Sequence, residues 1–598
     1  MKNFFPAKVM IFIYLLIAIS TTFFIYSMSH DSLMYGDDLR FHLSRAYELS
    51  QNNGRFSYIN TYTFGSLGNM ITAFYPSFLL YPLAFFLWLS HNFVLSTYFF
   101  LFIINLGTLL IADYSFRRIF QNQQWYRLGA VSFSILYYFA NYRMNNIYIR
   151  FDLGELLAQA FLPAVIGGLI VFLTSKNENR RINWLLVFGF TGVALSHLLS
   201  IILVVITLFV LLLIQFCHLI YQYQTGYIEE SRLRDFVLTI AKNTGFLLLL
   251  TSITWLPLVS HMLVLHDTLT MSFDQGEVYK SLDIIDFIQR NIDGSYFYNG
   301  WLLLLLIVIP IFLLFNKKAP FWTRSLSFFS IMMVLVQTTI LPVDKIIPLL
   351  SKKLQFSWRF NELYFILIIW LTCWFIFIYL PKNQFYQQYD WIKKPNFFYA
   401  VTALLFAFTS INVINHWYSV STNYAATLSK PTSMRKKLDN HNLAQELSVQ
   451  PYVLDYLPQR TKSVINDLKK HMVMSTKANH LSQVSHAEYT TKLTLESNEF
   501  IFNIEDNRQG DYLFIPIIAY NHDYRVTVNN QETDFEISQE HVPYIKNPTD
   551  KSIEIRIKYV PAWYDWLGQV IFLLTLIGTA FIYLEKTSKK PYRLIKNP

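Results

Sequence analysis

Long apolar stretches recur along the sequence and constrain its fold more than any other feature. A helix needs about 20 apolar residues to cross the core of a bilayer, and hydrophobic residues make up 53% of this 598-residue chain. We therefore predict a polytopic α-helical membrane protein with about 12 transmembrane helices. Residues 183–220 form an apolar run too long for one helix, so it is divided at Ser196 and His197. The predicted spans are 8–28, 95–113, 128–140, 157–174, 183–196, 198–220, 242–260, 301–315, 325–342, 361–380, 396–414 and 565–584.

Lysine and arginine residues indicate the orientation of these helices, because cytoplasmic loops of membrane proteins are enriched in both. The segment 74–90 is apolar but contains Pro76 and Pro82. If it is an interfacial or re-entrant helix and not a span, the basic clusters gather on one side of the membrane. We take this side, on which both termini also lie, as the cytoplasmic side. The net charge of +10 then reflects these loops and does not require a nucleic-acid partner. The predicted outer segments are 29–94, 141–156, the turn at His197, 261–300, 343–360 and 415–564.

The chain is predicted to have three parts. Residues 1–414 form the multi-span domain with its first outer loop at 29–94, residues 415–564 form an extracytoplasmic domain, and residues 565–598 form a final helix and a basic cytoplasmic tail. The extracytoplasmic part is polar and helical up to about residue 480, and then alternates as strands do, which predicts an α+β domain with a β-sandwich. The predicted strands are 492–495, 500–504, 512–515 and 553–557, and residues 524–531 are predicted to form a strand that runs into a tight turn.

A group of ionisable residues follows directly on the first apolar segment. Gly36 can turn the chain, and Asp37 or Asp38 can cap a helix that continues through Arg45. On this helix Asp38, His42 and Arg45 share one face, because they are spaced four and three residues apart. The residues therefore predict either a water-facing capped helix or a site that combines an acid, an imidazole and a guanidinium.

Other ionisable residues fall on the same predicted side of the membrane. Asp152 and Glu155 fit a capping box, whereas capping does not explain Arg150, which could hold a phosphate or a carboxylate. His197 lies at a turn between two apolar helices, as a structural residue or as part of the site. Arg359 enters a span three residues before Glu362, with which it could pair, or it could bind a lipid phosphate.

Several classes of chemistry have no matching motif. The sequence shows no Gly-rich phosphate loop, no Ser-His-Asp arrangement and no zinc spacing, so we expect no nucleotide, no haem and no zinc-cysteine site. Its two cysteines, Cys217 and Cys373, both lie in apolar segments, and we expect no disulfide.

The same residues support a resemblance to a known family. The features are Asp37 and Asp38 followed by Phe41-His42 and Arg45, Arg150 with Gly154-Glu155, the stretch Gln355-Phe-Ser-Trp-Arg359, Asp455-Tyr-Leu-Pro458, and late strands before a final helix. With them the chain resembles the YfhO-like integral membrane proteins of Gram-positive bacteria, within the GT-C class of membrane glycosyltransferases. Ser357 departs from the pattern, where a proline is expected.

This resemblance implies a GT-C-like fold in the bacterial plasma membrane. It also implies transfer of a sugar from a polyprenyl-phosphate carrier to an envelope acceptor, which could be a teichoic acid, another polysaccharide, a glycolipid or a protein. An acid in the first outer loop would act as base or bind a divalent cation (Mg or Mn), which points to Asp37 and Asp38. His42, Arg45, Asp152 and Glu155 would orient it, and Arg150, Arg359 and His197 would bind the lipid phosphate, whose charge grows in the transition state.

Two other functions remain open from the sequence. A transporter or flippase for lipid-linked envelope precursors would use the same cations but no catalytic acid, and would show broken helices in both halves. A non-catalytic scaffold would bind polymer through its outer β domain. A requirement for Asp37 and Asp38 distinguishes the enzyme from both.

Overall fold

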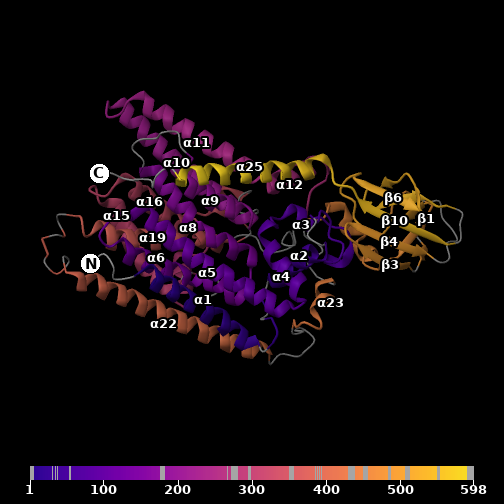
Figure 1. The fold of residues 1–598 in the computed structure, drawn as a ribbon, viewed down its shortest axis with the longest axis horizontal. Coiled ribbons are helices and arrows are strands. Elements are labelled where there is room, and N and C mark those ends of the chain that lie inside the picture. Colours follow the sequence, from indigo (N-terminus) through magenta and orange to yellow (C-terminus); the bar gives the residue numbers. More distant parts are fainter. Residues whose placement is uncertain are drawn as a thin grey trace.

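The computed structural model shows a long bundle of helices with a β-rich unit at one end (Figure 1). It describes residues 6–29, 31–33, 36, 38–52, 56–174, 182–265, 267–270, 280–293, 298, 300–348, 354, 356–383, 386, 388–389, 391, 394–428, 438–448, 456–477, 479–481, 487–489, 491–504, 512–548 and 552–588. Asp37, Gln355 and Asp455, which carried predictions above, lie outside these residues.

Seven helices of the described chain are long and apolar enough to cross a membrane, or eight if one bent pair counts as a span. The prediction of about 12 spans is therefore not confirmed. The chain is nonetheless a polytopic helical protein with a β-rich region near its C-terminus. The seven are Lys8–Ser29 in α1 (Ala7–Ser29), α5 (Phe93–Phe120), α8 (Leu153–Thr174), α10 (Leu198–Gln224), Ser357–Tyr379 in η5, α19 (Asn361–Trp374) and η6, Pro395–Tyr418 in α22 (Pro395–Leu428), and Trp563–Ile582 in α25 (Trp563–Ser588).

The other predicted spans are shorter helices or a broken one. A buried core helix is as apolar as a membrane span, so an apolar run alone does not separate the two. The predicted span at 242–260 is the bent pair α11 (Glu230–Leu250) and α12 (Ser252–Val264), which meet at 77°. The short helices are α6 (Tyr126–Tyr138), α9 (Trp184–Ala194), α14 (Gly300–Leu306), α15 (Val308–Phe315) and α16 (Phe321–Leu335).

Two features of the predicted helix map agree with the structure. The apolar run at 183–220 is divided between α9 and α10 at Ser196 and His197, as predicted. The segment 74–90 ends in α4 (Tyr81–Ser90), whose ten residues are too few to cross a bilayer.

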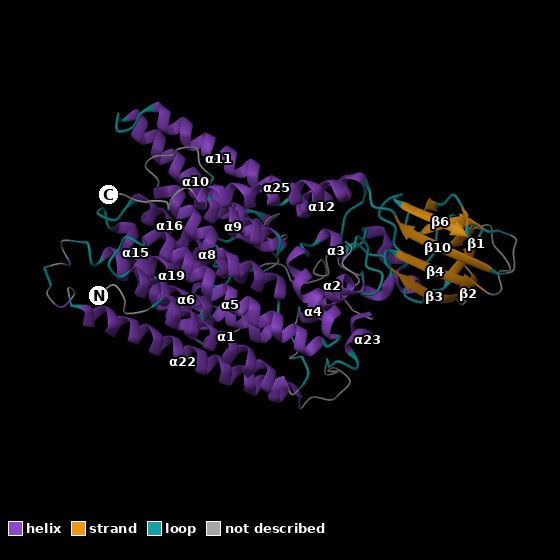
Figure 2. Ribbon diagram, viewed as in Figure 1, coloured by secondary structure: helices purple, strands orange, loops and turns teal. Residues whose placement is uncertain are grey.

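The β-rich unit consists of two five-stranded sheets with the orders β2-β1-β5-β9-β8 and β3-β4-β10-β6-β7 (Figure 2). All neighbouring strands are antiparallel. In the second sheet Ile555 of β10 lies opposite Phe502 of β4 and Val528 of β6, and all three side chains enter the core. The strands are β1 (Val473–Thr476), β2 (Ala487–Tyr489), β3 (Thr491–Glu496), β4 (Glu499–Ile504), β5 (Tyr512–Phe514), β6 (Tyr524–Val528), β7 (Gln531–Glu532), β8 (Glu536–Ile537), β9 (Pro543–Lys546) and β10 (Ile553–Tyr559).

The predicted strands coincide with β3, β4, β5, β6 and β10, and Asn529 and Asn530 form the turn with φ of 50° and 67°. The prediction of helix up to about residue 480 is wrong, because β1 begins at Val473. The boundary predicted at residue 414 falls inside α22.

The segment 56–74, which follows α2 (Leu39–Gln51), packs into the core of the β-rich unit. Ile59, Leu67 and Phe74 belong to the same hydrophobic cluster as the strand residues. The backbone N–H of Ile518 donates to the carbonyl oxygen of Leu67 at 2.8 Å. The segment 56–74 and the β-rich unit therefore share one hydrophobic core, which lies directly after α2 in the chain.

Candidate functional site

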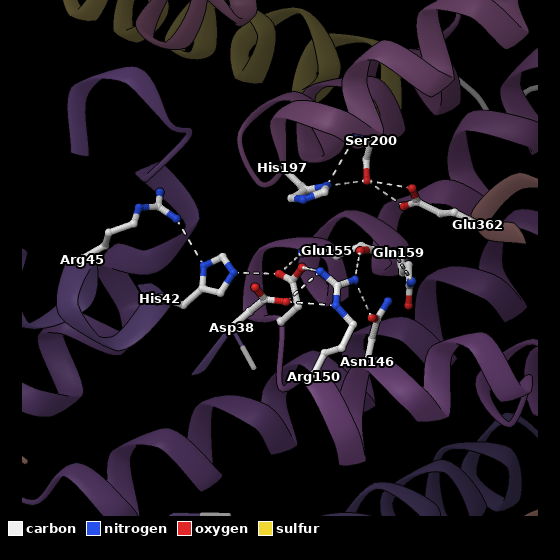
Figure 3. A network of polar contacts seen from close by, with 11 residues as sticks. Asp38, His42, Arg45, Asn146, Arg150, Glu155, Gln159, His197, Ser200 and Glu362 are labelled. Carbon is white, nitrogen blue, oxygen red and sulfur yellow. Dashed lines mark hydrogen bonds and ion pairs between the residues drawn. The ribbon is translucent and has the colours of Figure 1, made fainter. Parts of the chain in front are cut away.

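Four elements meet at the end of the bundle that faces the β-rich unit, and each contributes polar side chains (Figure 3). They are α2, the π-helical turn η3 (Asn146–Arg150) with the start of α8, the turn between α9 and α10, and η5 (Ser357–Phe360) with α19. At Gly36 an added Cβ would lie 2.5 Å from the carbonyl oxygen of Arg150, and Asp38 N–H donates to that oxygen at 2.9 Å. The close backbone approach at Gly36 therefore brings Asp38 beside Arg150.

Arg150 is the centre of the site. Its Nε donates to Asp38 Oδ2 at 2.9 Å, and its Nη2, which lies 2.7 Å from the same oxygen, donates to Asp152 Oδ2 at 2.8 Å. Its Nη1 donates to Glu155 Oε2 at 2.6 Å and to Asn146 Oδ1 at 3.0 Å. A guanidinium has five N–H groups, and Arg150 donates four hydrogen bonds to these acceptors.

The two carboxylates at the start of α8 serve both the helix and the site. Asp152 Oδ1 accepts from the backbone N–H of Glu155 at 2.9 Å, which is the predicted cap. Burial by itself would raise the Asp152 pKa, but Arg150 and His42 lower it well below its usual range. Burial would lower the pKa of Arg150, yet Asp38, Glu155 and Asp152 raise it above its ordinary value. Arg150 and Asp152 are therefore an ion pair at neutral pH.

His42 connects this ion pair to Arg45. Its Nε2 lies 2.7 Å from Asp152 Oδ1, and its Nδ1 lies 3.2 Å from Arg45 Nη1. Because Arg45 can only donate, Nδ1 must accept, so the proton lies on Nε2 and points at Asp152. Arg45 also donates to backbone oxygens of Tyr75 and Pro76 and lies 4.3 Å from the centroid of the Tyr75 ring. Gly154 leaves room for His42, because a Cβ there would lie 2.7 Å from the imidazole.

His197 reaches the site from the turn before α10. Its Nδ1 accepts the backbone N–H of Ser200 at 3.2 Å, and the Ser200 hydroxyl contacts both carboxylate oxygens of Glu362 at 2.7 and 2.9 Å. Burial lowers the His197 pKa to about 4, so the ring is neutral and carries its proton on Nε2. Asp152, Glu155 and His197 each place one potential ligand atom within 4.8 Å of the others. His197 therefore lies beside the two acids at the start of α8.

Arg359 and Tyr142 complete the site. Arg150 and Arg359 each lie 5.2 Å from the ring centroid of Trp358, and Arg359 is 7% exposed. Tyr142 is fully buried and is electrostatically coupled to Glu155 and Arg359 as well as Arg150. Its hydroxyl has no hydrogen-bond partner among the described residues.

The structure corrects one prediction and places the others. Asp38 directly precedes α2, but its side chain makes no capping hydrogen bond and contacts Arg150 instead, because a buried guanidinium is a stronger partner than a backbone N–H. Arg45 lies behind His42, on the side away from Arg150 (Figure 3). Sequence reasoning missed Asn146, Gln159, Ser200 and Tyr142, and considered Glu362 only as a partner for Arg359. Uncharged residues such as these carry no local motif, so only the fold shows their role.

Only one of the acids around Arg150 offers an oxygen to a ligand. Both oxygens of Asp152 have partners. Oδ2 accepts from Arg150, and Oδ1 contacts His42 and accepts the backbone N–H of Glu155 at the start of α8. Both oxygens of Glu155 also have partners. Oε2 accepts from Arg150, and Oε1 accepts from Gln159 Nε2 at 3.3 Å. Asp38 is 31% exposed, and no described residue donates to its Oδ1. Asp38 is therefore the carboxylate best able to contact a substrate.

Comparison with known proteins gives distant matches only. No protein-family model and no curated protein matches the sequence. The crystal structure of ArnT from Cupriavidus metallidurans bound to undecaprenyl phosphate aligns with a TM-score of 0.38 and 11% identity, over 78% of this chain and 81% of ArnT. The cryo-EM structure of the arabinofuranosyltransferase AftD from Mycobacteria aligns with a TM-score of 0.41 and 12% identity, over 92% of this chain and 40% of AftD. This chain thus spans less than half the length of AftD. TM-scores below 0.5 do not assign a fold, so the function is inferred below from the side chains.

Proposed function

We propose that the protein is a membrane glycosyltransferase of the GT-C class, which moves a sugar from a polyprenyl-phosphate carrier to an envelope acceptor. The observation that carries the proposal is the environment of Asp38. This partly exposed carboxylate is held through Oδ2 by a buried guanidinium, while no described residue donates to Oδ1. A carboxylate that is fixed through one oxygen and open at the other is suited to accept a proton from a hydroxyl group.

In the proposed reaction the acceptor oxygen attacks the anomeric carbon of the donor. The bond between that carbon and the phosphate oxygen breaks, and the polyprenyl phosphate leaves with the electron pair. The acceptor proton passes to Asp38 Oδ1. Negative charge that develops on the leaving phosphate requires nearby donors, and Arg359 and the Nε2–H group of His197 are suited to this role. Arg150 is less suited, because its Nε, Nη1 and Nη2 already donate to acceptors within the site.

We further propose that the site faces the outside of a bacterial plasma membrane, with both termini in the cytoplasm. Three features support this arrangement: the Lys and Arg distribution, the short α4, and the β-rich unit packed against the loop that carries the site. A YfhO-like family and a teichoic acid, polysaccharide, glycolipid or protein acceptor remain proposals that rest on the sequence.

The proposal can be tested with purified protein in liposomes. A panel of radiolabelled polyprenyl-phosphate sugars is supplied with envelope extract, and protein-dependent release of polyprenyl phosphate is measured. Glycans from cells with and without the gene identify the acceptor. If no donor is consumed and the envelope glycans are identical, the enzyme proposal is wrong.

One observation favours a second function, a flippase for lipid-linked precursors. The pair α11 and α12 is bent by 77°, and broken helices are a feature of transporters. A flippase would not need the Asp38 carboxylate. Transfer of labelled lipid across liposomes by an Asp38→Asn variant, without sugar transfer by the wild type, would favour it.

A further inference from the structure

Three carboxylates and one amide oxygen converge on a single buried cation in this site. Asp38 comes from the start of α2, Asn146 and Arg150 from η3, and Asp152 and Glu155 from the start of α8. The four acceptors lie 2.6 to 3.0 Å from guanidinium nitrogens. A set of carboxylate and amide oxygens from several elements is also what Mg²⁺ or Mn²⁺ selects.

We propose that the guanidinium of Arg150 takes the place that a divalent cation would hold among these oxygens, so that sugar transfer needs no metal. The claim that Arg150 takes the place of a cation rests on the geometry. The claim about sugar transfer also rests on the proposed function. Asp37 and Asp38 were the metal ligands expected from the sequence. Asp38 Oδ2 instead accepts a hydrogen bond from Arg150 Nε at 2.9 Å and lies 2.7 Å from Nη2.

These oxygens cannot coordinate a metal ion while they accept hydrogen bonds from Arg150. Asp152 and Glu155 have both carboxylate oxygens engaged by donors. A cation that displaced Arg150 would leave a buried guanidinium without acceptors, which is costly. A cation that bound beside Arg150 would meet its positive charge at short range in a site that excludes water.

His197 is also unsuited to bind a metal in this arrangement, although it lies near Asp152 and Glu155. A metal ligand must be a ring nitrogen with a free lone pair. The lone pair of Nδ1 accepts the Ser200 backbone N–H, and Nε2 of the neutral ring carries the proton. Coordination would therefore break the N-terminal cap of α10.

The arrangement has a consequence for catalysis. A bound metal can exchange with solvent, whereas Arg150 is covalently fixed in the chain and cannot be deprotonated in proteins. It keeps Asp38 oriented in every turnover. Arg150 is in this sense a positioning residue, because it acts on the substrate through Asp38.

The test compares Mn²⁺ binding by electron paramagnetic resonance in the wild type and in Arg150→Ala, with sugar transfer measured before and after EDTA. We expect the wild type to bind no Mn²⁺ at the site and to keep its activity in EDTA. Arg150→Ala should bind Mn²⁺ at least about tenfold more tightly than the wild type and should melt at a higher temperature with Mn²⁺ than without it, because a ligand stabilises the state that binds it. Adding Glu155→Gln to Arg150→Ala should abolish that binding.

Arg40→Ala is the matched control, since Arg40 forms a partly exposed ion pair with Glu446 at 3.7 Å, outside the site. It should behave as the wild type does. Loss of wild-type transfer in EDTA with recovery in Mn²⁺ would overturn the proposal, as would a folded Arg150→Ala variant that binds no Mn²⁺. If Arg150→Ala does not fold, the wild-type measurements decide. The Mn²⁺ signal does not depend on sugar transfer, so a failure of the proposed function is distinguishable from a failure of this inference.

Discussion

Two buried arginines seven residues apart have opposite surroundings. Arg150 donates to three carboxylates and an amide, and these carboxylates raise its pKa above the ordinary value. Arg143, in α7 (Asn141–Asn145), is fully buried, and it donates to neutral oxygens of Asn105, Thr108, Leu156 and Gln159. Burial lowers the pKa of Arg143.

The difference separates a charge that belongs to the reaction from one that supports the fold. Arg150 fixes Asp38, the carboxylate whose Oδ1 can contact a substrate. Arg143 acts on the site indirectly, through Gln159. It donates to Gln159 Oε1 at 3.4 Å, and this contact directs the Gln159 amide nitrogen toward Glu155. Four predictions test this distinction, in order of expected effect.

The largest effect is expected for Asp38→Asn, which keeps the shape of the side chain but removes its charge and its ability to accept a proton. Loss of a general base typically lowers the rate by about 10²–10⁴-fold. Sugar transfer in liposomes measures it, and the amount of folded protein should not change. Asp293→Asn, at an exposed helix end, is the control. Transfer by Asp38→Asn at a near-normal rate would remove Asp38 from the mechanism.

The second prediction concerns the stability that Arg150 provides. Arg150→Met leaves the carboxylates of Asp152 and Glu155 buried without their cation. Breaking a buried ion pair on one side typically costs about 3–5 kcal/mol. Unfolding of the variant in detergent should show a loss of that size, and the double variant Arg150→Met/Glu155→Gln should recover part of it. A loss no larger than that of a surface ion pair would mean that the acids are solvated.

The sequence predicted the residues of the acid cluster better than their arrangement. Spacing on a helix placed Asp38, His42 and Arg45 on one face, and the capping pattern found Asp152 with Glu155. The contact between Asp38 and Arg150 joins residues 112 positions apart, and it depends on the close approach at Gly36. Local periodicity contains no information about such a contact.

The same limit applies to the neutral groups and to the fold. Gln159, Ser200 and Tyr142 resemble ordinary helix residues until tertiary packing places them beside charges. The strands with regular alternation, such as β4 and β10, were predicted from the sequence. Among the strands of two to four residues only β5 was predicted, and β1, β2, β7, β8 and β9 were not, because so few residues rarely show a period.

The third prediction concerns pH. Burial lowers the pKa of His197 to about 4, whereas the histidine of the unfolded state has a pKa near 6.5. On acidification, the folded state therefore binds this proton at a lower pH than the unfolded state does. The stability associated with neutral His197 is therefore present above pH 6.5 and is lost as the pH falls from 6.5 to about 4.

His197→Asn should reduce the loss of stability on acidification, by an amount on the order of 1–3 kcal/mol, because asparagine can still cap α10. Melting temperatures between pH 7 and pH 4 provide the measurement. His91→Asn is the control, since His91 is exposed and has a positive φ of 51° that asparagine tolerates. Equal acid sensitivity in His197→Asn and the wild type would show that His197 is protonated in the fold.

The smallest effect is expected for Arg143→Met. The short hydrogen bond to Thr108 at 2.8 Å is lost, and the three contacts at 3.4 Å are too long to contribute much. The variant also removes a charge that burial disfavours, and apolar replacements of buried charges are often neutral. We therefore expect a change in stability of about 1 kcal/mol or less, far below that of Arg150→Met. Sugar transfer should fall only because the loss of Arg143 releases Gln159 and lets Glu155 shift. Gln159→Leu should therefore lower transfer by a similar factor, and the double variant should lower it no further. If Arg143→Met instead destabilises the fold as much as Arg150→Met does, the carboxylates around Arg150 are not what separates the two arginines, and the proposed division between them fails.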